Sequence, residues 1–476
     1  MRIRFGTDGW RGVIADDFTF SNVRVCAQGV AAYLQRAGKA SGGVIIGYDT
    51  RFGSRDFAVA AAEVVAANGI PVHFCGKVAP TPVISFAVKE RGAGGAIIIT
   101  ASHNPGRYNG FKFRPDYAGA ASGEIIAQVQ SAIDAVQENG GEARRLTYRQ
   151  SLSQGLIHEF DPRPAYFARL AELVRLDRIR LSPLRVAVDS MYGAGMGYFS
   201  ALLDGGEIVV DEVHGEPNPL FPDINAPEPG PHNLAALRAL VMSSGAHIGL
   251  ATDGDADRLA LVDERGRSLD NFEVYPLLLH YLLAVQNARG AVIKTVATSS
   301  MVDRVAEHFG VPVHMTGVGF KHIAPAMMAL KAMIGGEESG GYAFGDHIPE
   351  RDGILAGLRV IDMLVQSREP LSVLLEKLRT RYGRYFYRKR DLPFSEALRE
   401  QVESFIRRGC PDKVAGIPVA HVFSEDGLRL ELTDGSWVLL RLSGTEPVVR
   451  ILAESSSEVV VTRILDDVLG LLGLPA

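Results

Sequence analysis

The stretch AIIITASHNPGRYNGFK, residues 96–112, decides how the first part of this chain folds. Its apolar residues are typical of a buried parallel strand, and they stop abruptly at Ser102 and His103. Because α/β proteins place ligands at the carboxyl ends of parallel strands, the turn would expose the Ser102 hydroxyl at a binding site. The same residues also suit a helix cap beside a surface histidine. A hydrolase nucleophile elbow is excluded, because glycines do not flank Ser102 in Gly-x-Ser-x-Gly spacing.

Apolar runs and amphipathic segments alternate along most of the chain. Short β-rich runs bounded by glycine, as at residues 42–50, favour buried parallel strands, and the apolar period at 124–137 favours a helix. Near residue 370 the pattern changes, and Asp434-Gly435 between two alternating runs indicates a β-hairpin. We therefore expect an α/β protein with three similar α/β domains of mixed, largely parallel sheets and a smaller C-terminal α+β domain, around a central cleft. The predicted domains are residues 1–145, 146–257, 258–370 and 371–476.

Bulk properties restrict the surroundings of the protein. Its 476 residues carry a formal net charge of −5 and three widely spaced cysteines, Cys26, Cys75 and Cys410. This charge gives no general attraction to nucleic acid or anionic membranes, and the cysteines suggest neither a disulfide framework nor a metal knuckle. No apolar run reaches bilayer length, and the N-terminal residues lack the hydrophobic region of a secretion signal. We expect a cytoplasmic protein, and we interpret the basic segment 377–390 as a solvated interdomain surface.

The segment TDGDADR, residues 252–258, has the pattern of a metal loop. Asp253, Asp255 and Asp257 alternate, so one turn can fold three carboxylates around a hard cation such as Mg²⁺. A calcium EF-hand is excluded, because Arg258 occupies the position that needs glycine and a strand precedes the loop. A solvated turn is the weaker alternative, since three close carboxylates repel one another unless a cation offsets them.

Three further segments suit a phosphorylated sugar, although each alone also fits an ordinary loop. GGEESGG (335–341) offers acceptors and a donor for sugar hydroxyls. RLSGTEPVVR (441–450) combines two guanidinium groups, two hydroxyls and a glycine-opened backbone, which suits a phosphate. Arg11 follows glycine-rich turns in FGTDGWRG (5–12). The spacing of a nucleoside triphosphate P-loop is absent from the sequence.

Taken in order, these segments resemble the α-D-phosphohexomutase superfamily, which includes phosphoglucomutase and phosphomannomutase. TASHNP (100–105) resembles its phosphoserine loop, DGDADR (253–258) its metal loop, GEESG (336–340) its sugar loop and RLSGT (441–445) its phosphate loop. The metal loop departs from the pattern at Ala256, where glycine is more usual. The similarity extends from Phe5 to about Leu452.

The resemblance implies a role for each matching residue. Ser102 would carry a phosphoryl group, and Asp253, Asp255 and Asp257 would hold Mg²⁺ against it. Arg11 and Lys112 would be fixed cations, and either Lys112 or His103 would move the substrate proton. The implied substrate-binding residues are Arg258, Thr316, Gly319, Lys321, Glu337, Ser339, His347, Arg351, Arg441, Ser443, Gly444, Thr445 and Arg450, with His347 and Arg351 in the cleft.

The resemblance also implies the reaction, a reversible transfer between C1 and C6 of a hexose phosphate through a bound hexose 1,6-bisphosphate. The loop around Glu337 favours glucose; the alternatives are mannose or dual specificity, then glucosamine or a pentose. Two alternatives come from other functional classes: a sugar-phosphate phosphatase and a non-enzymatic sugar-phosphate-binding protein. The resemblance further implies small-molecule hexose phosphates as partners, a monomer or homodimer, and a hinge near residues 367–390 that lets the last domain close.

Overall fold

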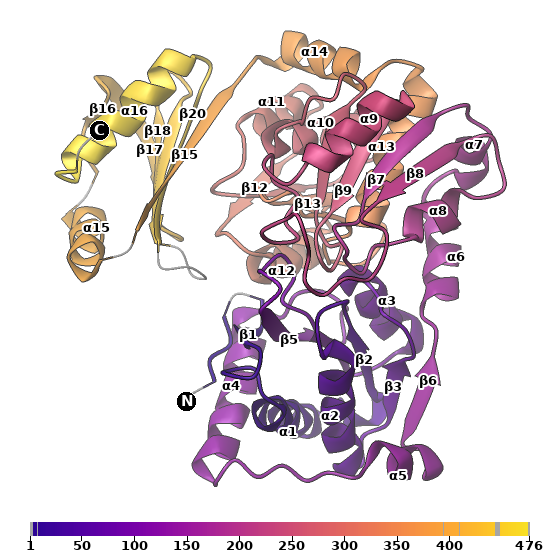
Figure 1. Cartoon of the computed structure of the whole chain (residues 1–476). Helices are drawn as coiled ribbons and strands as arrows, with labels where there is room; N and C mark the ends of the chain where they lie inside the picture. Colours follow the sequence, from indigo (N-terminus) through magenta and orange to yellow (C-terminus); the bar gives the residue numbers. More distant parts are fainter. Residues whose placement is uncertain (1–2, 7, 394, 409, 443–447, 475–476) are drawn as a thin grey trace.

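The computed structural model describes residues 3–474, apart from residues 7, 394, 409 and 443–447. The chain forms four sheets, each covered by helices that follow in sequence (Figure 1). Three sheets are mixed and mostly parallel, and the C-terminal sheet is antiparallel, so the predicted fold class is confirmed. Within the described part of the chain, no helix has both the length and the apolar character needed to span a membrane.

The first sheet has the strand order β1-β5-β4-β2-β3-β6. Its inner strands β4, β2, β3 and β6 are parallel, whereas β5 and β1 are added antiparallel at one edge. Every residue of β4 is buried, because helices cover both faces of the sheet. The elements are β1 (Trp10–Val13), α1 (Phe20–Arg36), the 3₁₀ turn Ala40–Gly42, β2 (Val44–Tyr48), α2 (Ser54–Ala67), β3 (Val72–Cys75), α3 (Thr81–Arg91), β4 (Gly95–Ile99), β5 (Tyr108–Pro115), α4 (Gly123–Glu138), α5 (Tyr148–Ser153) and β6 (Ile157–Phe160).

The second and third sheets repeat this plan with four strands each, in the orders β10-β9-β7-β8 and β12-β11-β13-β14. In each, one edge strand is antiparallel, β10 in the second sheet and β14 in the third. The elements are α6 (Arg163–Leu173), α7 (Leu176–Arg180), β7 (Arg185–Asp189), α8 (Tyr198–Leu203), β8 (Val209–Val213), α9 (Ala235–Ser244), β9 (Ile248–Thr252) and β10 (Leu259–Asp263), then α10 (Asn271–Ala284), β11 (Val292–Thr295), α11 (Met301–His308), β12 (Val313–Thr316), α12 (Phe320–Leu330), β13 (Ile334–Gly336), β14 (Tyr342–Phe344), α13 (Gly353–Ser367) and α14 (Leu371–Tyr382).

The C-terminal sheet has the order β15-β20-β19-β18-β17-β16 and stands beside the third domain (Figure 1). The predicted hairpin is present, with β18 paired to β19 across Asp434 and Gly435. The elements are β15 (Phe386–Pro393), α15 (Glu396–Arg408), β16 (Lys413–Val414), β17 (Ile417–Phe423), β18 (Leu428–Leu432), β19 (Trp437–Leu442), β20 (Val448–Ser455) and α16 (Glu458–Leu471).

The sheets extend beyond the domain boundaries drawn from the sequence. Strand β6 pairs with β3, so the first sheet continues past residue 145. Strand β10 pairs with β9, so the second sheet continues past residue 257. Helix α14 packs against α10 and α11, which places it with the third domain. The chain then crosses to the last domain through residues 383–385, within the segment where a hinge is predicted.

Hydrophobic packing joins the first three domains more closely than the fourth. One continuous core contains buried residues from all three, for example Ile98, Leu250 and Ile334. The C-terminal domain has a core of its own. It contacts the third domain through a small apolar set that includes Phe272, Val296 and Trp437.

Candidate functional site

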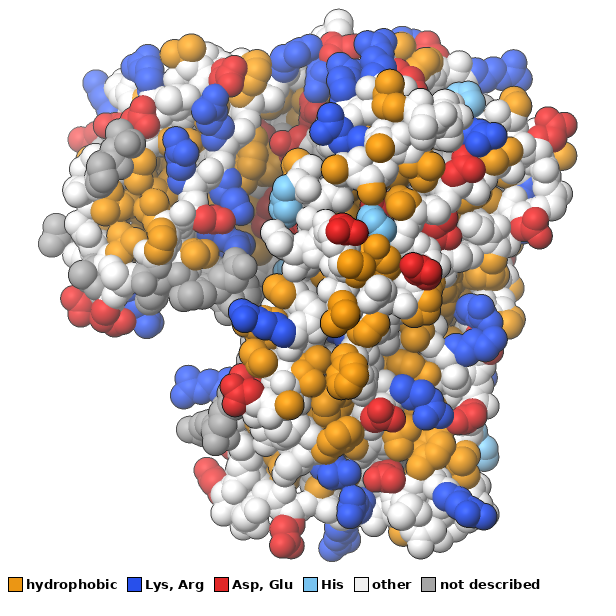
Figure 2. Space-filling view, viewed as in Figure 1, with side chains coloured by type: hydrophobic (Ala, Val, Ile, Leu, Met, Phe, Trp, Pro, Cys, Tyr) orange, Lys and Arg blue, Asp and Glu red, His pale blue; other side chains and the backbone are white. Residues whose placement is uncertain are grey.

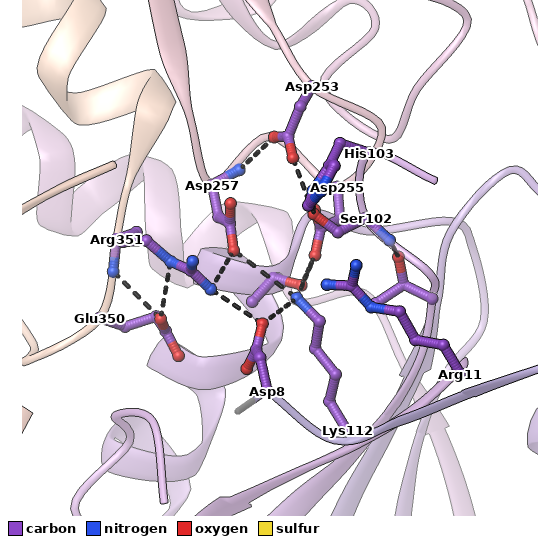
Figure 3. A network of polar contacts seen from close by, with 12 residues as sticks. Asp8, Arg11, Ser102, His103, Lys112, Asp253, Asp255, Asp257, Glu350 and Arg351 are labelled. Atoms are coloured by element: carbon purple, nitrogen blue, oxygen red, sulfur yellow. Dashed lines mark hydrogen bonds and ion pairs between the residues drawn. The ribbon is translucent and has the colours of Figure 1, made fainter. Parts of the chain in front are cut away.

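The hydroxyl of Ser102 lies at the carboxyl end of β4 and faces the second domain (Figure 3). It donates a hydrogen bond of 2.8 Å to Oδ2 of Asp253, and the Nδ1 atom of His103 lies 3.3 Å away. The backbone of Ser102 has φ of +51°, a conformation that a serine adopts at a cost. Its N–H donates to Oγ1 of Thr100, which fixes the turn.

Three buried aspartates follow strand β9, as the sequence predicts. One oxygen from each of Asp253, Asp255 and Asp257 lies within 4.8 Å of the others. The loop lies close to the turn of residues 102–108 (the serine turn). A Cβ atom on Gly254 would be only 2.5 Å from the carbonyl oxygen of Ser102. Among the described residues, Oδ1 of Asp255 and Oδ1 of Asp257 have no hydrogen-bond partner, although both are buried. Buried carboxylate oxygens with free acceptor capacity fit a divalent cation such as Mg²⁺.

A shared carboxylate, Asp8, connects the cations of this site (Figure 3). Its oxygens lie 2.8 Å from Nζ of Lys112, 2.9 Å from Nη1 of Arg114 and 2.9 Å from Nη2 of Arg351. The same Nη2 atom of Arg351 lies 2.7 Å from Oδ2 of Asp257. These groups come from the first, second and third domains, so the ion network forms only where the three domains meet.

The electrostatic environment divides the carboxylates into two kinds. Burial, reinforced by the neighbouring Asp257 and Asp255, raises the pKa of Asp253 well above its usual range. Burial also opposes ionisation of Asp8, but the surrounding arginines and Lys112 outweigh it and hold the pKa of Asp8 well below its usual range. The network around Asp8 is therefore charged. Lys112 also outweighs burial at Asp255 and lowers the pKa of that carboxyl, so the repulsion that a cation would relieve is concentrated at Asp253.

Lys112 and His103 differ in their readiness to accept a proton. Burial lowers the pKa of Lys112, but the attraction of Asp255, Asp8 and Asp257 outweighs burial and raises it overall. Burial and the nearby cations hold the pKa of His103 well below its usual range. At neutral pH, Lys112 is a fixed cation and His103 is a neutral imidazole.

The sugar-loop segment adjoins the metal loop through its backbone. Arg258 and Gly341 form a β-bridge, and the N–H of Leu259 donates to the carbonyl of Gly340. Glu337 is buried, with Oε2 3.4 Å from Nη1 of Arg351. Burial raises the pKa of Glu337 to about 7 despite this arginine.

Most of the sequence-predicted residues of the first three domains lie in or beside this network. The structure brings together Arg11, Ser102, His103, Lys112, Asp253, Asp255, Asp257, Arg258, Glu337, Ser339 and Arg351. Arg11 reaches the serine turn through Oδ1 of Asn104. The prediction that His347 lies in the cleft is wrong, because its side chain is 1% exposed and stacks on Phe86.

The predicted phosphate-binding residues lie on the separate C-terminal domain. Arg441 donates to Asp426, and Asp426 also accepts from the N–H of Val318, in the segment that contains the predicted substrate-binding residues Thr316, Gly319 and Lys321. Arg450 pairs with Arg441 in the register of β19 and β20. Ser443, Gly444 and Thr445 lie outside the described residues. Figure 2 shows the surface hollowed between this domain and the first domain.

Sequence reasoning missed several charged residues of the network. Asp8 lies inside the FGTDGWRG segment, but nothing in that segment distinguishes it from an ordinary turn aspartate. Arg114 could have been found, because residues two apart on a strand share a face and Lys112 was already a candidate. Glu350, which pairs with Arg114, is recognisable only from the structure.

Comparisons with known proteins agree with this geometry. Four models of phosphoglucomutase/phosphomannomutase match in order: α/β/α domain I at residues 2–140, α/β/α domain II at 164–266, α/β/α domain III at 273–382 and the C-terminal domain at 405–471. A phosphoglucomutase/phosphomannomutase of Thermococcus kodakarensis is 30% identical over 461 residues, which are 95% of each chain. The chain belongs to the phosphoglucomutase/phosphomannomutase family. It is therefore an enzyme of the isomerase class, a phosphohexomutase.

Other members of the family differ in the sugar that their names give. A protein of Methanothermobacter thermautotrophicus, provisionally named a phosphoglucosamine mutase, is 34% identical over 470 residues, covering 95% of this chain and 94% of that one. A crystal structure from Thermus thermophilus, provisionally named a phosphomannomutase, superposes with a TM-score of 0.85 at 32% identity and covers 99% of both chains. These relatives confirm the family but leave the hexose open.

The raised pKa of Glu337 predicts a pH-dependent stability. Between the usual pKa of a glutamate and about 7, the folded protein keeps a proton that the unfolded chain releases, so the free energy of unfolding falls as pH rises. We expect Glu337→Gln to gain stability relative to the parent by on the order of 1–3 kcal/mol between pH 5 and pH 8. Denaturant unfolding at both pH values measures this, with the exposed Glu172→Gln as a control. If the difference in unfolding free energy between Glu337→Gln and the parent is the same at both pH values, the pKa of Glu337 is not raised.

Proposed function

We propose that this protein interconverts glucose 1-phosphate and glucose 6-phosphate through a phosphoserine at Ser102. The single observation that carries the proposal is the contact of 2.8 Å between Oγ of Ser102 and Oδ2 of Asp253, at the edge of a buried trio of carboxylates. A hydroxyl held against a candidate Mg²⁺ site suits phosphoryl transfer, because this reaction depends mainly on positioning and charge stabilisation.

The residues of this chain divide the work of the transfer. The bond between phosphorus and Oγ of Ser102 breaks as a bond from phosphorus to the sugar oxygen forms, and the sugar hydroxyl releases its proton. The Nδ1 atom of the neutral His103 lies 3.3 Å from Oγ, so we assign His103 to accept that proton. Nζ of Lys112 already donates to Asp255, so we assign it to charge stabilisation together with Arg11.

Asp253, Asp255 and Asp257 would hold Mg²⁺ together with an oxygen of the phosphorylated Ser102. When bound, Mg²⁺ supplies positive charge that offsets the charge of the transferring phosphoryl group. The free acceptor capacity of Asp255 and Asp257 supports this assignment.

The second half of the reaction needs a grip on the phosphate that does not react. In the proposed cycle the sugar becomes a hexose 1,6-bisphosphate, turns end for end while bound, and returns its other phosphate to Ser102. Glu337 and Ser339 would accept the sugar in both orientations, and Arg441, Ser443, Thr445 and Arg450 would hold the distal phosphate. The hollow between the first and last domains supports a sugar enclosed between them (Figure 2).

Removal of the Ser102 hydroxyl tests the reaction. We expect Ser102→Ala to lower turnover of glucose 1-phosphate by at least 10³-fold, because no other group can carry the phosphoryl. Ser85→Ala, which changes another buried serine on α3, should keep normal turnover. Intact mass should show one phosphate on the parent and none on Ser102→Ala. A phosphatase would release inorganic phosphate without forming glucose 6-phosphate, and a binding protein would be unaffected by the change.

Charge neutralisation in the metal loop should weaken binding of Mg²⁺. In Asp253→Asn the side-chain carbonyl can still accept the N–H groups of Asp257 and Arg258, which the carboxylate accepts in the parent, so the turn should persist. We expect the Mg²⁺ dissociation constant to rise at least tenfold, as measured by calorimetric titration. Asp263→Asn, at the other end of β10, should leave it unchanged. Equal affinities in all three proteins would contradict the assigned metal site.

The hexose itself is decided by relative turnover. Glucose is the first choice from the sugar loop, and the relative from Methanothermobacter makes glucosamine 1-phosphate a specific alternative. We expect the kcat/KM for glucose 1-phosphate to exceed that for glucosamine 1-phosphate by at least tenfold, with mannose 1-phosphate between them. The reverse order would keep the phosphoryl-transfer mechanism and change the substrate.

A further inference from the structure

A single buried arginine holds the backbone of the turn that carries Ser102. Arg51 follows strand β2 and is 3% exposed. Its Nη2 atom donates to the carbonyl oxygens of Ser102 and Asn104, both at 2.6 Å. Its Nη1 atom donates to the carbonyl oxygens of Pro105 and Tyr108, both at 2.9 Å. All four hydrogens on the two terminal nitrogens are therefore used on one turn.

The guanidinium group is itself fixed from two sides. Its Nε atom lies 3.1 Å from Oδ2 of Asp49, and the other oxygen of Asp49 accepts from Oγ of Ser54. The ring of Phe221, from the second domain, lies 5.1 Å from the guanidinium carbon. Phe221 belongs to the proline-rich segment 216–232, whose carbonyl at Pro227 accepts the N–H of Gly254 in the metal loop. The same segment thus contacts both the arginine and the aspartate loop.

The turn needs this support for two physical reasons. The carbonyl of Pro105 also accepts the N–H of Tyr108, and that of Arg107 accepts the N–H of Ile14, but the carbonyls of Ser102 and Asn104 lie outside any strand, and carbonyls without donors cost free energy when they are buried. Ser102 also has a left-handed backbone, which a serine does not favour. Without Arg51, nothing else among the described residues donates to the carbonyls of Ser102 and Asn104.

We propose that Arg51 is a positioning residue for phosphoryl transfer, which sets Oγ of Ser102 at its distance from Asp253 by holding the four carbonyls of the serine turn. The inference rests on the proposed role of Ser102 and adds to it a residue that touches neither sugar nor metal. Its function is geometric: displacement of a reacting atom by about 1 Å can cost about 10²-fold in rate.

Lysine cannot replace this arginine, although it keeps the charge. An ammonium group has three donors on one nitrogen, whereas the four carbonyls are served by two nitrogens of a planar fork. Arg51→Lys should therefore leave the ion pair with Asp49 but release part of the turn.

The test compares Arg51→Lys with Arg359→Lys in the full chain. Arg359 is a matched control, because it is 4% exposed, pairs with Asp346 and lies over the ring of Phe344, away from the serine turn. We expect Arg51→Lys to lower kcat by about 10²-fold with KM changed less than threefold, since the substrate contacts remain. Hydrogen exchange of the amides in residues 101–108 should quicken at least tenfold in Arg51→Lys only.

Two results would overturn the inference. One is turnover of folded Arg51→Lys within twofold of the parent. The other is a loss of activity with unchanged exchange in residues 101–108. If Arg51→Lys does not fold, the double variant Asp49→Asn, Arg51→Gln leaves no unpaired buried charge and is measured in the same way. In each case Ser102→Ala separates this outcome from failure of the proposed function, because full turnover in that variant would refute the phosphoserine itself.

Discussion

The arrangement of the site depends on one carboxylate that three cations share. Asp8 lies within 2.9 Å of Lys112, Arg114 and Arg351, and the side chains of Lys112 and Arg114 are each 1% exposed. Charges buried this deeply are tolerated only when each has a partner, because desolvation costs several kcal/mol per ion. Since Arg351 comes from the third domain and also pairs with Asp257 of the second, these ion pairs help to fix how the first three domains sit relative to one another.

The same requirement explains why the metal loop is poised for a cation. Three cations pair with Asp8, and two of them, Lys112 and Arg351, also pair with Asp255 and Asp257. They do not satisfy the remaining oxygens of these two aspartates, and burial raises the pKa of Asp253. Buried carboxylate oxygens without hydrogen-bond donors lower the stability of a protein, so we expect them mainly at sites where they bind a ligand or take part in a reaction. The structure thus separates the charges that hold the domains from the charges that remain free for a ligand.

Much of the fold and the reactive centre could be predicted from the sequence, because the signals are local. The apolar run before Ser102 and the alternation of Asp253, Asp255 and Asp257 each lie within a few residues. The run forms strand β4 and the three carboxylates cluster, while their roles in the reaction stay predictions. The role of Arg51 could not be predicted, because its partners lie about fifty residues further along the chain. The pairing of β6 with β3 could not be predicted either, because β6 lies beyond residue 145, where the predicted first domain ends.

The placement of His347 shows the limit of motif matching. Arg351, four residues further along the chain, pairs with Asp257 in the site. The ring of His347 instead packs against the rings of Phe86 and Tyr166. A sequence segment specifies where a loop lies, whereas the direction of each side chain depends on the backbone of that loop. Only the three-dimensional structure distinguishes a ligand from a packing residue here.

The sharing of Asp8 has a consequence for the newly made chain. Arg351 is 343 positions after Asp8, so the ribosome delivers the first carboxylate long before its last partner. At about 5–20 residues per second, roughly 240 residues separate the emergence of Lys112 from that of Arg351 by tens of seconds. During that interval Asp8 can pair only with Lys112 and Arg114 of its own domain, and the surface that will contact the third domain is exposed to water. The ion network of the candidate site is therefore completed only once the third domain has emerged from the ribosome.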